Sequence, residues 1–350
     1  MRTQSKPMKQ ISVVILNWNG ANLLTTFLPS VIKYSEHIAD IYVADNGSTD
    51  NSIEVCRTQF PTVKIIDNKE NHGFAGGYNL AIQEITTPYT LLLNSDVEVT
   101  ENWLEPLVTA LENDPFLAAV QPKIKAFHEK DYFEYAGASG GFLDKNFFPF
   151  CRGRLFNVFE EDQGQYNTNK EIFWASGAAM LTRTNLYKQV KGLDADYFAH
   201  MEEIDLCWRF KNMGYRIGVI PAATVFHVGG ATLSQFSTHK LFLNFRNSLF
   251  LIFKNYRGVL FTKLFARLFL DGIASAKFLL EGNFGNLFAV LKAHIHFYLQ
   301  LPKLIRKRRA NKKTWHKTPN MIGWYQKNIT FQFFLKKKKH FSDLNPNDFI

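Results

Sequence analysis

The chain has 350 residues, 46% of them hydrophobic and 15% aromatic, which excludes a mainly disordered protein and allows two or three structural units. Its net charge of +10 is unevenly distributed: residues 1–240 hold 21 Lys and Arg against 27 Asp and Glu, whereas residues 241–350 hold 20 against 4. This asymmetry predicts two parts with different tasks, and the basic part, where Phe and Leu accompany the charges, favours an anionic membrane surface as partner over nucleic acid.

Cysteine usage and the N-terminus indicate the compartment. Cys56, Cys151 and Cys207 are far apart and odd in number, so they predict neither a disulfide framework nor a Cys-based zinc site. This favours a reducing environment. The polar N-terminal sequence MRTQSKPMKQ is followed by a short apolar run, and no signal peptide is predicted there.

The first third of the chain alternates between strand-like and helix-like segments. Short apolar segments rich in β-branched residues predict strands at 11–17, 41–45, 63–67 and 89–94. Helical spacing of apolar residues occurs at 21–34, 75–85 and 101–113. This alternation predicts βαβ units and a parallel sheet with helices on both faces. In such open sheets, ligands bind beyond the carboxyl ends of the strands.

Polar residues follow three of these strands at the point where each strand ends. The sequences are NWNG (17–20), DNGS (45–48) and NSD (94–96). In a parallel sheet these ends share one edge, so the side chains are predicted to converge there. Each sequence alone is equally typical of ordinary turns and helix caps. Their convergence favours a site in which Asp96 would hold Mg²⁺ or Mn²⁺ together with substrate phosphates.

The pattern changes after a further strand near 118–127. The aromatic, Gly-rich and acidic residues 132–171 predict a long loop, and a buried strand is predicted at 172–182. A helix is predicted at 202–214, followed by two short strands within 215–230.

Other residues in this part of the chain carry candidate chemistry. His227, in VFHVGG, would complete the coordination of a cation at Asp96, although a lone His is more often structural. Gly73 and Gly76, in NHGFAGGYN, would expose backbone N–H groups to phosphate at a helix start. They lack the GxGxxG spacing, so a dinucleotide site is only weakly supported.

Three acids, Glu202, Glu203 and Asp205, lie within four residues at the start of the predicted helix. Negative charge at this end of a helix is favourable in itself, because it complements the helix dipole. The same cluster would suit a general base beside a substrate hydroxyl, with neighbouring acids raising its pKa. The residues alone leave both interpretations open.

The C-terminal part is expected to be helical. In FTKLFARLFLDGIASAKFLL (261–280), Lys263, Arg267 and Asp271 fall on one face of a helix, and Phe and Leu fill the opposite face. No stretch reaches the roughly 18–20 uncharged residues of a membrane-spanning helix. With the basic segments LPKLIRKRRANKKTWHK and FFLKKKKHF, this predicts helices in a membrane interface. The alternative is a helical domain packed on the core.

Seven motifs together resemble family 2 glycosyltransferases of the GT-A fold, and in particular the bacterial rhamnosyltransferase-like branch. They occur in the family's order over about residues 11–250. The motifs are VVILNWNG, VADNGSTDNS, NHGFAGGYN, LLLNSDVEV, GLDADYF, EEIDLCWR and FHVGG. The fold implied is α/β, a mostly parallel sheet flanked by helices, followed by the C-terminal amphipathic helical region.

The resemblance implies roles for individual residues. Asn17, Trp18 and Asp45 match positions that hold the nucleoside, and Asn94-Ser95-Asp96 matches the Asp-x-Asp motif that binds ribose and the diphosphate's metal ion. Asp96 and His227 are the metal ligands that this match implies. The predicted nucleotide-sugar-binding set is Asn17, Trp18, Asp45, Gly73, Gly76, Asn94, Ser95, Asp96, Gly177 and Glu202.

The family's Glu-Asp pair carries the general base at its second position. Here that position is Glu203, with Asp205 as the competing candidate. Gly177, in ASGAAM, matches a position near the donor sugar and acceptor. Arg246 and Asn247 match the junction with the membrane-facing helices, where a structural role is expected.

We therefore expect a catalytic domain at 1–240, with a nucleotide-binding half at about 11–100 and an acceptor half at about 101–240. The basic, aromatic-rich residues 241–350 are expected to associate with a membrane. The resemblance implies an inverting, metal-assisted transfer from a nucleotide-diphosphate sugar to an acceptor hydroxyl in cell-surface polysaccharide synthesis. Because residues 255–340 would hold the enzyme at the cytoplasmic face of the inner membrane, a lipid-linked glycan is the expected acceptor.

Two alternatives remain. A sugar-phosphate nucleotidyltransferase would need a basic Gly-rich loop after its first strand, and NWNGANLL carries no positive charge. The second alternative is a membrane-bound carbohydrate-binding relative that lacks catalysis, because Asn94 and Glu203 both depart from the family pattern.

Overall fold

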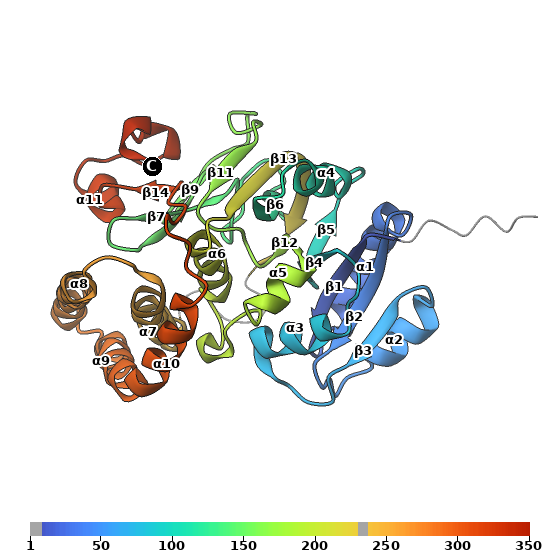
Figure 1. The fold of residues 1–350 in the computed structure, drawn as a ribbon, viewed down its shortest axis with the longest axis horizontal. Helices are drawn as coiled ribbons and strands as arrows, with labels where there is room; N and C mark the ends of the chain where they lie inside the picture. Colours follow the sequence, from blue (N-terminus) through green and yellow to red (C-terminus); the bar gives the residue numbers. More distant parts are fainter. Residues whose placement is uncertain (1–8, 230–236) are drawn as a thin grey trace, which may run out of the picture.

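The computed structural model describes residues 9–229 and 237–350. It contains a central sheet flanked by helices and, beside it, a bundle of C-terminal helices (Figure 1). Gly230, the last residue of the FHVGG motif, lies outside the described residues. Within the described residues, no helix combines the length and apolar composition needed to cross a membrane.

The central sheet contains nine of the described strands, and their order confirms the predicted α/β fold class. Eight follow the order β11-β13-β6-β12-β4-β1-β2-β3, and β5 pairs with β13. The strands are β1 (Ile11–Asn17), β2 (Ala39–Asp45), β3 (Lys64–Asp67), β4 (Tyr89–Asn94), β5 (Val97–Val99), β6 (Leu117–Ala126), β11 (Lys170–Ile172), β12 (Ala179–Arg183) and β13 (Arg216–His227). The neighbours β4-β1-β2-β3 are parallel, as predicted, whereas β12 runs antiparallel to both β4 and β6.

Alternate residues of β1 and β4 pack on opposite faces of the sheet. Val14 and Leu92 lie in the core that includes α3, whereas Val13 and Leu91 lie in the core that includes α1. Both sets are buried because helices cover both faces, which explains the uninterrupted apolar sequence of these strands. The helices of this region are α1 (Ala21–Ser35), α2 (Ser52–Gln59), α3 (Gly73–Gln83), α4 (Glu105–Asn113), α5 (Thr184–Gln189), the short η1 (Ala195–Tyr197) and α6 (Glu202–Asn212).

Two strand predictions were wrong in detail. The apolar segment 172–182 is not one strand: it leaves β11, turns through 175–178 and enters β12 at a different place in the sheet. Burial alone produced its apolar character, and the small residues of the turn interrupt the strand. Conversely, 215–230 contains the single strand β13, with an irregularity between Ile220 and Thr224 beside Pro221.

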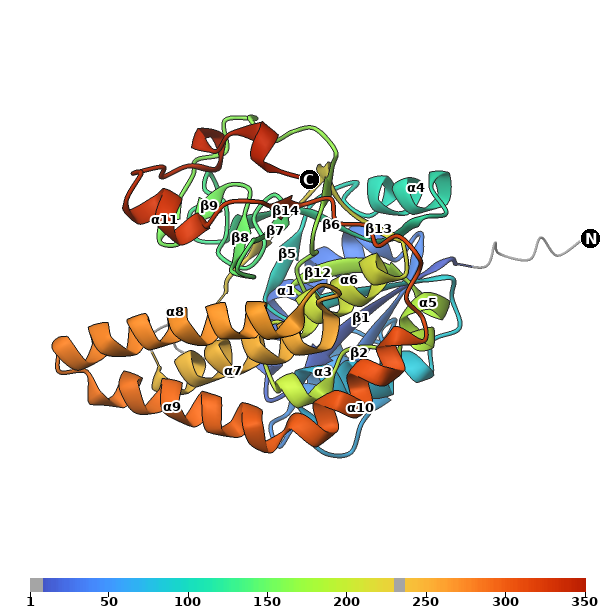
Figure 2. The ribbon, with the colours of Figure 1, turned by 60° about the vertical axis from the view of Figure 1, so that its left-hand side comes forward.

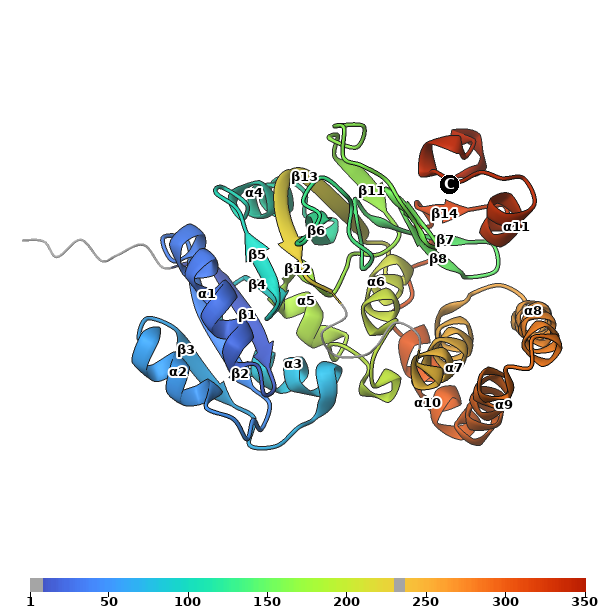
Figure 3. The ribbon, with the colours of Figure 1, turned by 180° about the vertical axis from the view of Figure 1, so that it is seen from behind.

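The predicted loop 132–171 forms much of a second, five-stranded sheet of order β10-β9-β8-β7-β14. Its strands are β7 (Gly141–Asp144), β8 (Pro149–Cys151), β9 (Arg154–Leu155), β10 (Val158–Phe159) and β14 (Trp324–Tyr325). Strands of two to four residues carry too little periodicity to be recognised. The last strand comes from the C-terminal segment, which therefore returns to the catalytic part instead of continuing the helical region (Figure 3).

The C-terminal helical region confirms that part of the fold prediction. It consists of α7 (Thr238–Asn255), α8 (Leu260–Leu280), α9 (Phe284–Leu299) and α10 (Leu301–Lys312). Figure 2 shows α8 and α9 as two long helices beside α7. Three short elements follow: α11 (Ile329–Phe334), η2 (Phe341–Asp343) and η3 (Pro346–Asp348).

Candidate active site

The ends of β1, β2 and β4 lie side by side, so the polar residues predicted to converge do share one edge of the sheet. Asn17 is in register with Asp45, and Leu16 with Asn94. The Asn17 amide Nδ2 donates to Asp45 Oδ1 at 3.0 Å and to Ser48 Oγ at 3.1 Å. The Ser48 backbone N–H donates to Asp45 Oδ2 at 2.9 Å. These bonds fix both side chains before any ligand arrives.

One polar atom of this cluster has no protein partner. Asn17 Oδ1 is buried and accepts no hydrogen bond from the described residues. Gly20 lies directly beside it, since a Cβ at Gly20 would stand 2.5 Å from this oxygen. The neighbouring Trp18 ring is 53% exposed. An unsatisfied buried acceptor costs stability unless a ligand or water supplies a donor, so this corner is suited to a polar ligand.

Asp96 and His227 are 131 positions apart in the sequence but meet at the same edge of the sheet, as the prediction of a shared cation requires. The pairing of β5 with β13 sets His227 opposite Val97 and brings its Nε2 to 3.1 Å from Asp96 Oδ1. Asn94 Nδ2 lies 3.3 Å from the same ring nitrogen. Both Asp96 and His227 are buried.

This pair fits two ligands of one divalent cation. At bond lengths of about 2.1 Å, two adjacent octahedral ligand atoms stand about 3 Å apart, close to the observed separation of Asp96 and His227. Within the described part of the chain, no group of three His, Cys, Asp or Glu side chains is arranged to hold a metal ion. Such an ion would therefore take its remaining ligands from substrate phosphates and water, as Mg²⁺ usually does.

Glu134 supports His227 from the other side, and sequence analysis missed it. Its Oε2 lies 3.3 Å from His227 Nδ1, the arrangement in which a carboxylate orients a ligating imidazole. Burial would lower the pKa of His227, but Asp96 and Glu134 hold this pKa at about 10. Burial likewise opposes ionisation of Asp96, yet the contact with His227 leaves its pKa below the ordinary value. No local motif marks Glu134, which lies in the predicted loop.

The start of α6 carries Glu202 and Glu203 to a meeting point of three segments. A Cβ at Gly177 would lie 3.5 Å from the Phe74 ring and 3.7 Å from Glu203 Cβ. The beginnings of α3 and α6 therefore face each other across the turn that contains Gly177. Gly73, which has φ +68°, opens α3 beside the carbonyl of Phe198. Gly76 packs against His72 in the first turn of the same helix.

Glu202 and Glu203 differ in their surroundings. Glu202 is buried, and burial followed by repulsion from Glu203 raises its pKa well above the ordinary value. Glu203 is partly exposed, and burial raises its pKa to about 7. A carboxylate that titrates near neutral pH has the proton affinity of an effective general base. The raised pKa of Glu202 favours its protonated form, which reduces repulsion between the two acids.

Asp205 has a different environment, which gives no support to the prediction that it competes as base. It is fully buried and its pKa is lowered, because burial is overcome by Lys254 and Arg209. The Lys254 ammonium lies 2.8 Å from Oδ1, and the Arg209 Nε lies 2.9 Å from Oδ2. Tyr197 and Asn255 donate further hydrogen bonds to Oδ1. A carboxylate satisfied in this way ties α6 to α7.

The segment before α6 is held in a strained conformation by α7. Phe198, His200 and Met201 all have φ between +65° and +73°, a region that residues with a side chain rarely adopt. The Asn247 amide donates to the carbonyls of Tyr197, Ala199 and His200 at 2.8–3.2 Å. Arg246 donates to the carbonyls of Asp196 and Tyr197. Arg246 and Asn247, the residues predicted at the junction with the C-terminal helices, thus hold in place the segment of chain that leads to Glu203.

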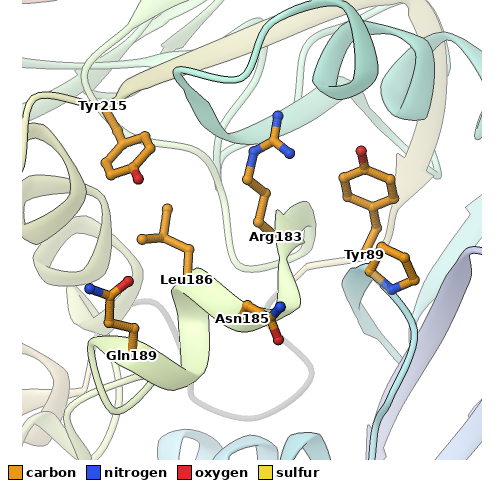
Figure 4. Close-up of a pocket in the computed structure, with 7 residues that line it drawn as sticks. Tyr89, Arg183, Asn185, Leu186, Gln189 and Tyr215 are labelled. Carbon is orange, nitrogen blue, oxygen red and sulfur yellow. The ribbon is translucent and has the colours of Figure 1, made fainter.

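A surface pocket of about 310 Å³ lies elsewhere (Figure 4). It is lined by Tyr89, the first residue of β4, and by Arg183, Leu186 and Tyr215. Tyr89 lies at the opposite end of β4 from Asn94. The pocket therefore lies outside the candidate site, and Arg183 already donates to three backbone carbonyls there.

The sheet order and the polar strand ends at one edge define an α/β fold of the kind that binds ligands beyond the carboxyl ends of its strands. The model of the family described as glycosyl transferase family 2 matches residues 12–190, about half of the chain. The protein belongs to this family.

Curated relatives and a solved structure agree with the family and the fold. An N-acetylglucosaminyl-diphospho-decaprenol L-rhamnosyltransferase of Mycobacterium tuberculosis is 24% identical over 234 residues, 62% of this chain and 75% of the relative. The low-salt glycan biosynthesis hexosyltransferase Agl10 of Haloferax volcanii is 22% identical over 254 residues, 70% of this chain and 76% of the relative. A crystal structure of GalNAc-T7 with UDP, GalNAc and Mn²⁺ superposes with a TM-score of 0.54 and 18% identity, over 71% of this chain and 48% of that one. At this identity the last match shows the fold alone.

Proposed function

We propose that this protein transfers a sugar from a nucleotide-diphosphate donor to a hydroxyl of a lipid-linked glycan acceptor, with inversion at the anomeric carbon. The observation that carries the proposal is the contact at the end of β4, where the Asn94 backbone N–H donates to the carbonyl of Ala178. This bond brings the strand end that carries the Asp96–His227 pair beside the turn of Gly177, which adjoins Glu203. The relative from Mycobacterium tuberculosis supports the acceptor class, because its name contains a diphospho-decaprenol acceptor. By analogy, the product would contribute to cell-surface polysaccharide, made at the cytoplasmic face of the membrane.

Donor binding begins at the corner formed by β1 and β2. Asn17 Oδ1 is an acceptor without a partner among the residues that the structure describes, and Asp45 supplies carboxylate oxygens beside it. Together they would bind the N–H and hydroxyl donors of a base and ribose. The exposed ring of Trp18 offers a surface beside the nucleoside. The Gly73 backbone N–H already donates to Asn71 Oδ1 at 2.8 Å, so the next N–H groups in the first turn of α3 would face the donor.

Asp96 and His227 would hold Mn²⁺ or Mg²⁺ with the donor diphosphate. A bound divalent cation supplies Lewis-acid stabilisation of the charge that develops on the departing nucleoside diphosphate. Asn94 and Ser95 line the same strand end, and Glu134 keeps the His227 ring in place. Asn94 replaces the first acid of the family motif, so Asp96 is its one carboxylate.

Glu203 would accept the proton of the acceptor hydroxyl. The acceptor oxygen then forms its bond to the anomeric carbon as the bond to the diphosphate breaks on the opposite face. One displacement of this kind inverts the configuration and leaves the proton on Glu203. Gly177 keeps the space above Glu203 open, because a side chain there would point at Phe74 and Glu203.

A nucleotide-release assay tests this function. A panel of uridine-, thymidine- and guanosine-linked sugars would be incubated with the protein, a membrane lipid extract as acceptor, and Mn²⁺ or EDTA. Metal-dependent release of a nucleoside diphosphate from one donor, with sugar incorporated into lipid, is the expected outcome. Formation of a nucleoside triphosphate and a sugar 1-phosphate when pyrophosphate is added would instead identify a nucleotidyltransferase. Donor binding without turnover would identify a non-catalytic binding protein.

The rate should depend on pH through Glu203. Because the deprotonated form accepts the proton, kcat should be high above the Glu203 pKa of about 7 and fall about tenfold per pH unit below it. The measurement is kcat from pH 5 to 9 at saturating donor and Mn²⁺, so that binding does not limit the rate. A flat profile across this range would argue against Glu203 as base.

Asn247→Ala should lower kcat by about tenfold to a hundredfold. The substitution removes the hydrogen bonds to the carbonyls of Tyr197, Ala199 and His200, which allows the strained segment before Glu203 to relax. The donor KM should change little, since Asn247 does not contact the nucleoside corner. Asn244→Ala, on the same helix, is the matched control. Equal kcat in both variants would show that these bonds do not position Glu203.

A further inference from the structure

The helix α8 has an inverted distribution of polar and apolar side chains. Its buried residues are Arg267 and Asp271, whereas Phe261, Phe265 and Phe269 are 78%, 63% and 62% exposed. Sequence analysis identified these two faces but not which one would point outward. In a helix that faces water, the apolar face is normally the buried one. The reverse arrangement, with charges inside and large apolar side chains outside, is that of a helix facing lipid.

The buried charges of α8 are paired with each other and with a histidine of α9. Arg267 Nε donates to Asp271 Oδ1 at 2.7 Å, and His294 of α9 lies 3.2 Å from Asp271 Oδ2. The Arg267 guanidinium also stacks over Phe148 of the catalytic part, 4.4 Å from the ring centre. These contacts fix the rotation of α8 about its axis. The outward orientation of its Phe residues is therefore built into the packing.

The exposed apolar side chains form one stripe on each helix of the α8–α9 hairpin. On α8 they recur every four residues from Phe261 to Ile273, and the helix is about 31 Å long at 1.5 Å per residue. On α9 they recur at helical spacing from Phe284 to Leu299. Leu280, at the hairpin turn, is 89% exposed. Soluble proteins rarely leave such an extended apolar surface in water.

Charge identifies the occupant of this surface. Residues 260–313 contain eleven Lys and Arg and two acids, and α10 contains no acid at all. Six of these basic side chains lie on α10, directly after α9, and four of the six are exposed: Lys303, Arg306, Arg309 and Lys312. A second copy of the chain would place the same positive charge against itself, whereas anionic headgroups would complement it. Apolar stripes beside a basic helix match an anionic bilayer surface.

We infer that the α8–α9 hairpin inserts its exposed apolar stripes into the interface of an anionic lipid bilayer, with α10 on the headgroups. Gly285, near the hairpin turn, lies beside Thr238, the first residue of α7. His239, which follows Thr238 in the same helix, packs edge-on against Phe198. Phe198 belongs to the segment before Glu203. The insertion would therefore bring a lipid-linked acceptor towards the catalytic edge, a consequence that rests on the proposed function.

Vesicle flotation tests the inference without any sugar donor, so its outcome is independent of catalysis. The full chain should float with vesicles of phosphatidylcholine and phosphatidylglycerol, and less with phosphatidylcholine alone. Phe261→Ser/Phe265→Ser/Phe269→Ser should weaken binding at least about tenfold. The control is Phe116→Ser/Phe159→Ser, which changes exposed rings of the catalytic part and should bind like the wild type. Circular dichroism would verify that both variants fold.

A second variant tests the charge separately. Arg306→Glu/Arg309→Glu reverses two exposed charges of α10 and should abolish the preference for anionic vesicles. The inference is overturned if the wild type does not float, or if the triple variant floats equally well. It is also overturned if the wild type forms a dimer and the triple variant is a monomer, since the apolar stripes would then bind a second copy of the chain.

Discussion

Glu203→Gln should reduce kcat about a thousandfold while leaving the affinity for the sugar nucleotide nearly unchanged. The amide keeps the size and hydrogen-bonding capacity of the side chain but cannot accept the proton of the acceptor hydroxyl. Burial holds the pKa of Glu203 at about 7, so the wild-type carboxylate is both largely ionised and sufficiently basic above this pH. Single-turnover rates with a saturating donor and lipid acceptor would measure the chemical step directly.

Two further variants make this result specific. Glu203→Asp restores the acid that the family has at this position and should recover part of the rate, with a loss that reflects its shorter reach. Glu112→Gln, an exposed residue of α4, is the matched control and should behave as wild type. If Glu203→Gln kept more than about a tenth of the wild-type kcat, the proton would have to leave by another route.

Asp96→Ala should weaken Mn²⁺-dependent binding of the nucleoside diphosphate by at least about a hundredfold and abolish metal-dependent turnover. Asp96 supplies the one carboxylate of its motif, and its Oδ1 forms the candidate metal site with His227 Nε2 at 3.1 Å. Titration calorimetry of a nucleoside diphosphate, with Mn²⁺ and with EDTA, would separate the metal-dependent part of binding from the nucleoside contacts.

Glu134→Gln provides a graded companion to this experiment. It removes the carboxylate that faces His227 Nδ1 but no metal ligand, so Mn²⁺ affinity should fall about tenfold to a hundredfold. Asp131→Ala, an exposed acid in the same segment, is its control. Equal Mn²⁺-dependent binding in wild type and Asp96→Ala would show that the cation is held elsewhere.

The sequence alone predicted the side of the sheet formed by β1 to β4 well. Strands β1 to β4 are mainly apolar and each ends in Asn or Asp, and βαβ connectivity places such ends on one edge whatever the details of packing. Asn17, Asp45 and Asp96 could therefore be grouped before their contacts were known. The motifs around them added the family, which the match over residues 12–190 confirms.

Tertiary structure decided what local pattern could not. Three features depend on contacts between distant segments. They are the different positions of β11 and β12 in the sheet although both come from one apolar segment, the addition of β14 to the second sheet, and the position of Glu134 beside His227. The same holds for the acids Glu203 and Asp205, which are two positions apart in the sequence. Pairing with Lys254 and Arg209 lowers the pKa of Asp205, and burial raises the pKa of Glu203.

The α8 helix shows this division most clearly. Its period and its two faces follow from the order of residues, because the geometry of the α-helix fixes which side chains share a face. Which face points outward depends on the partners that Arg267 and Asp271 find in α9 and the catalytic part. The sequence thus determined that α8 has one charged and one apolar side, and only the packing around it placed the apolar side on the surface.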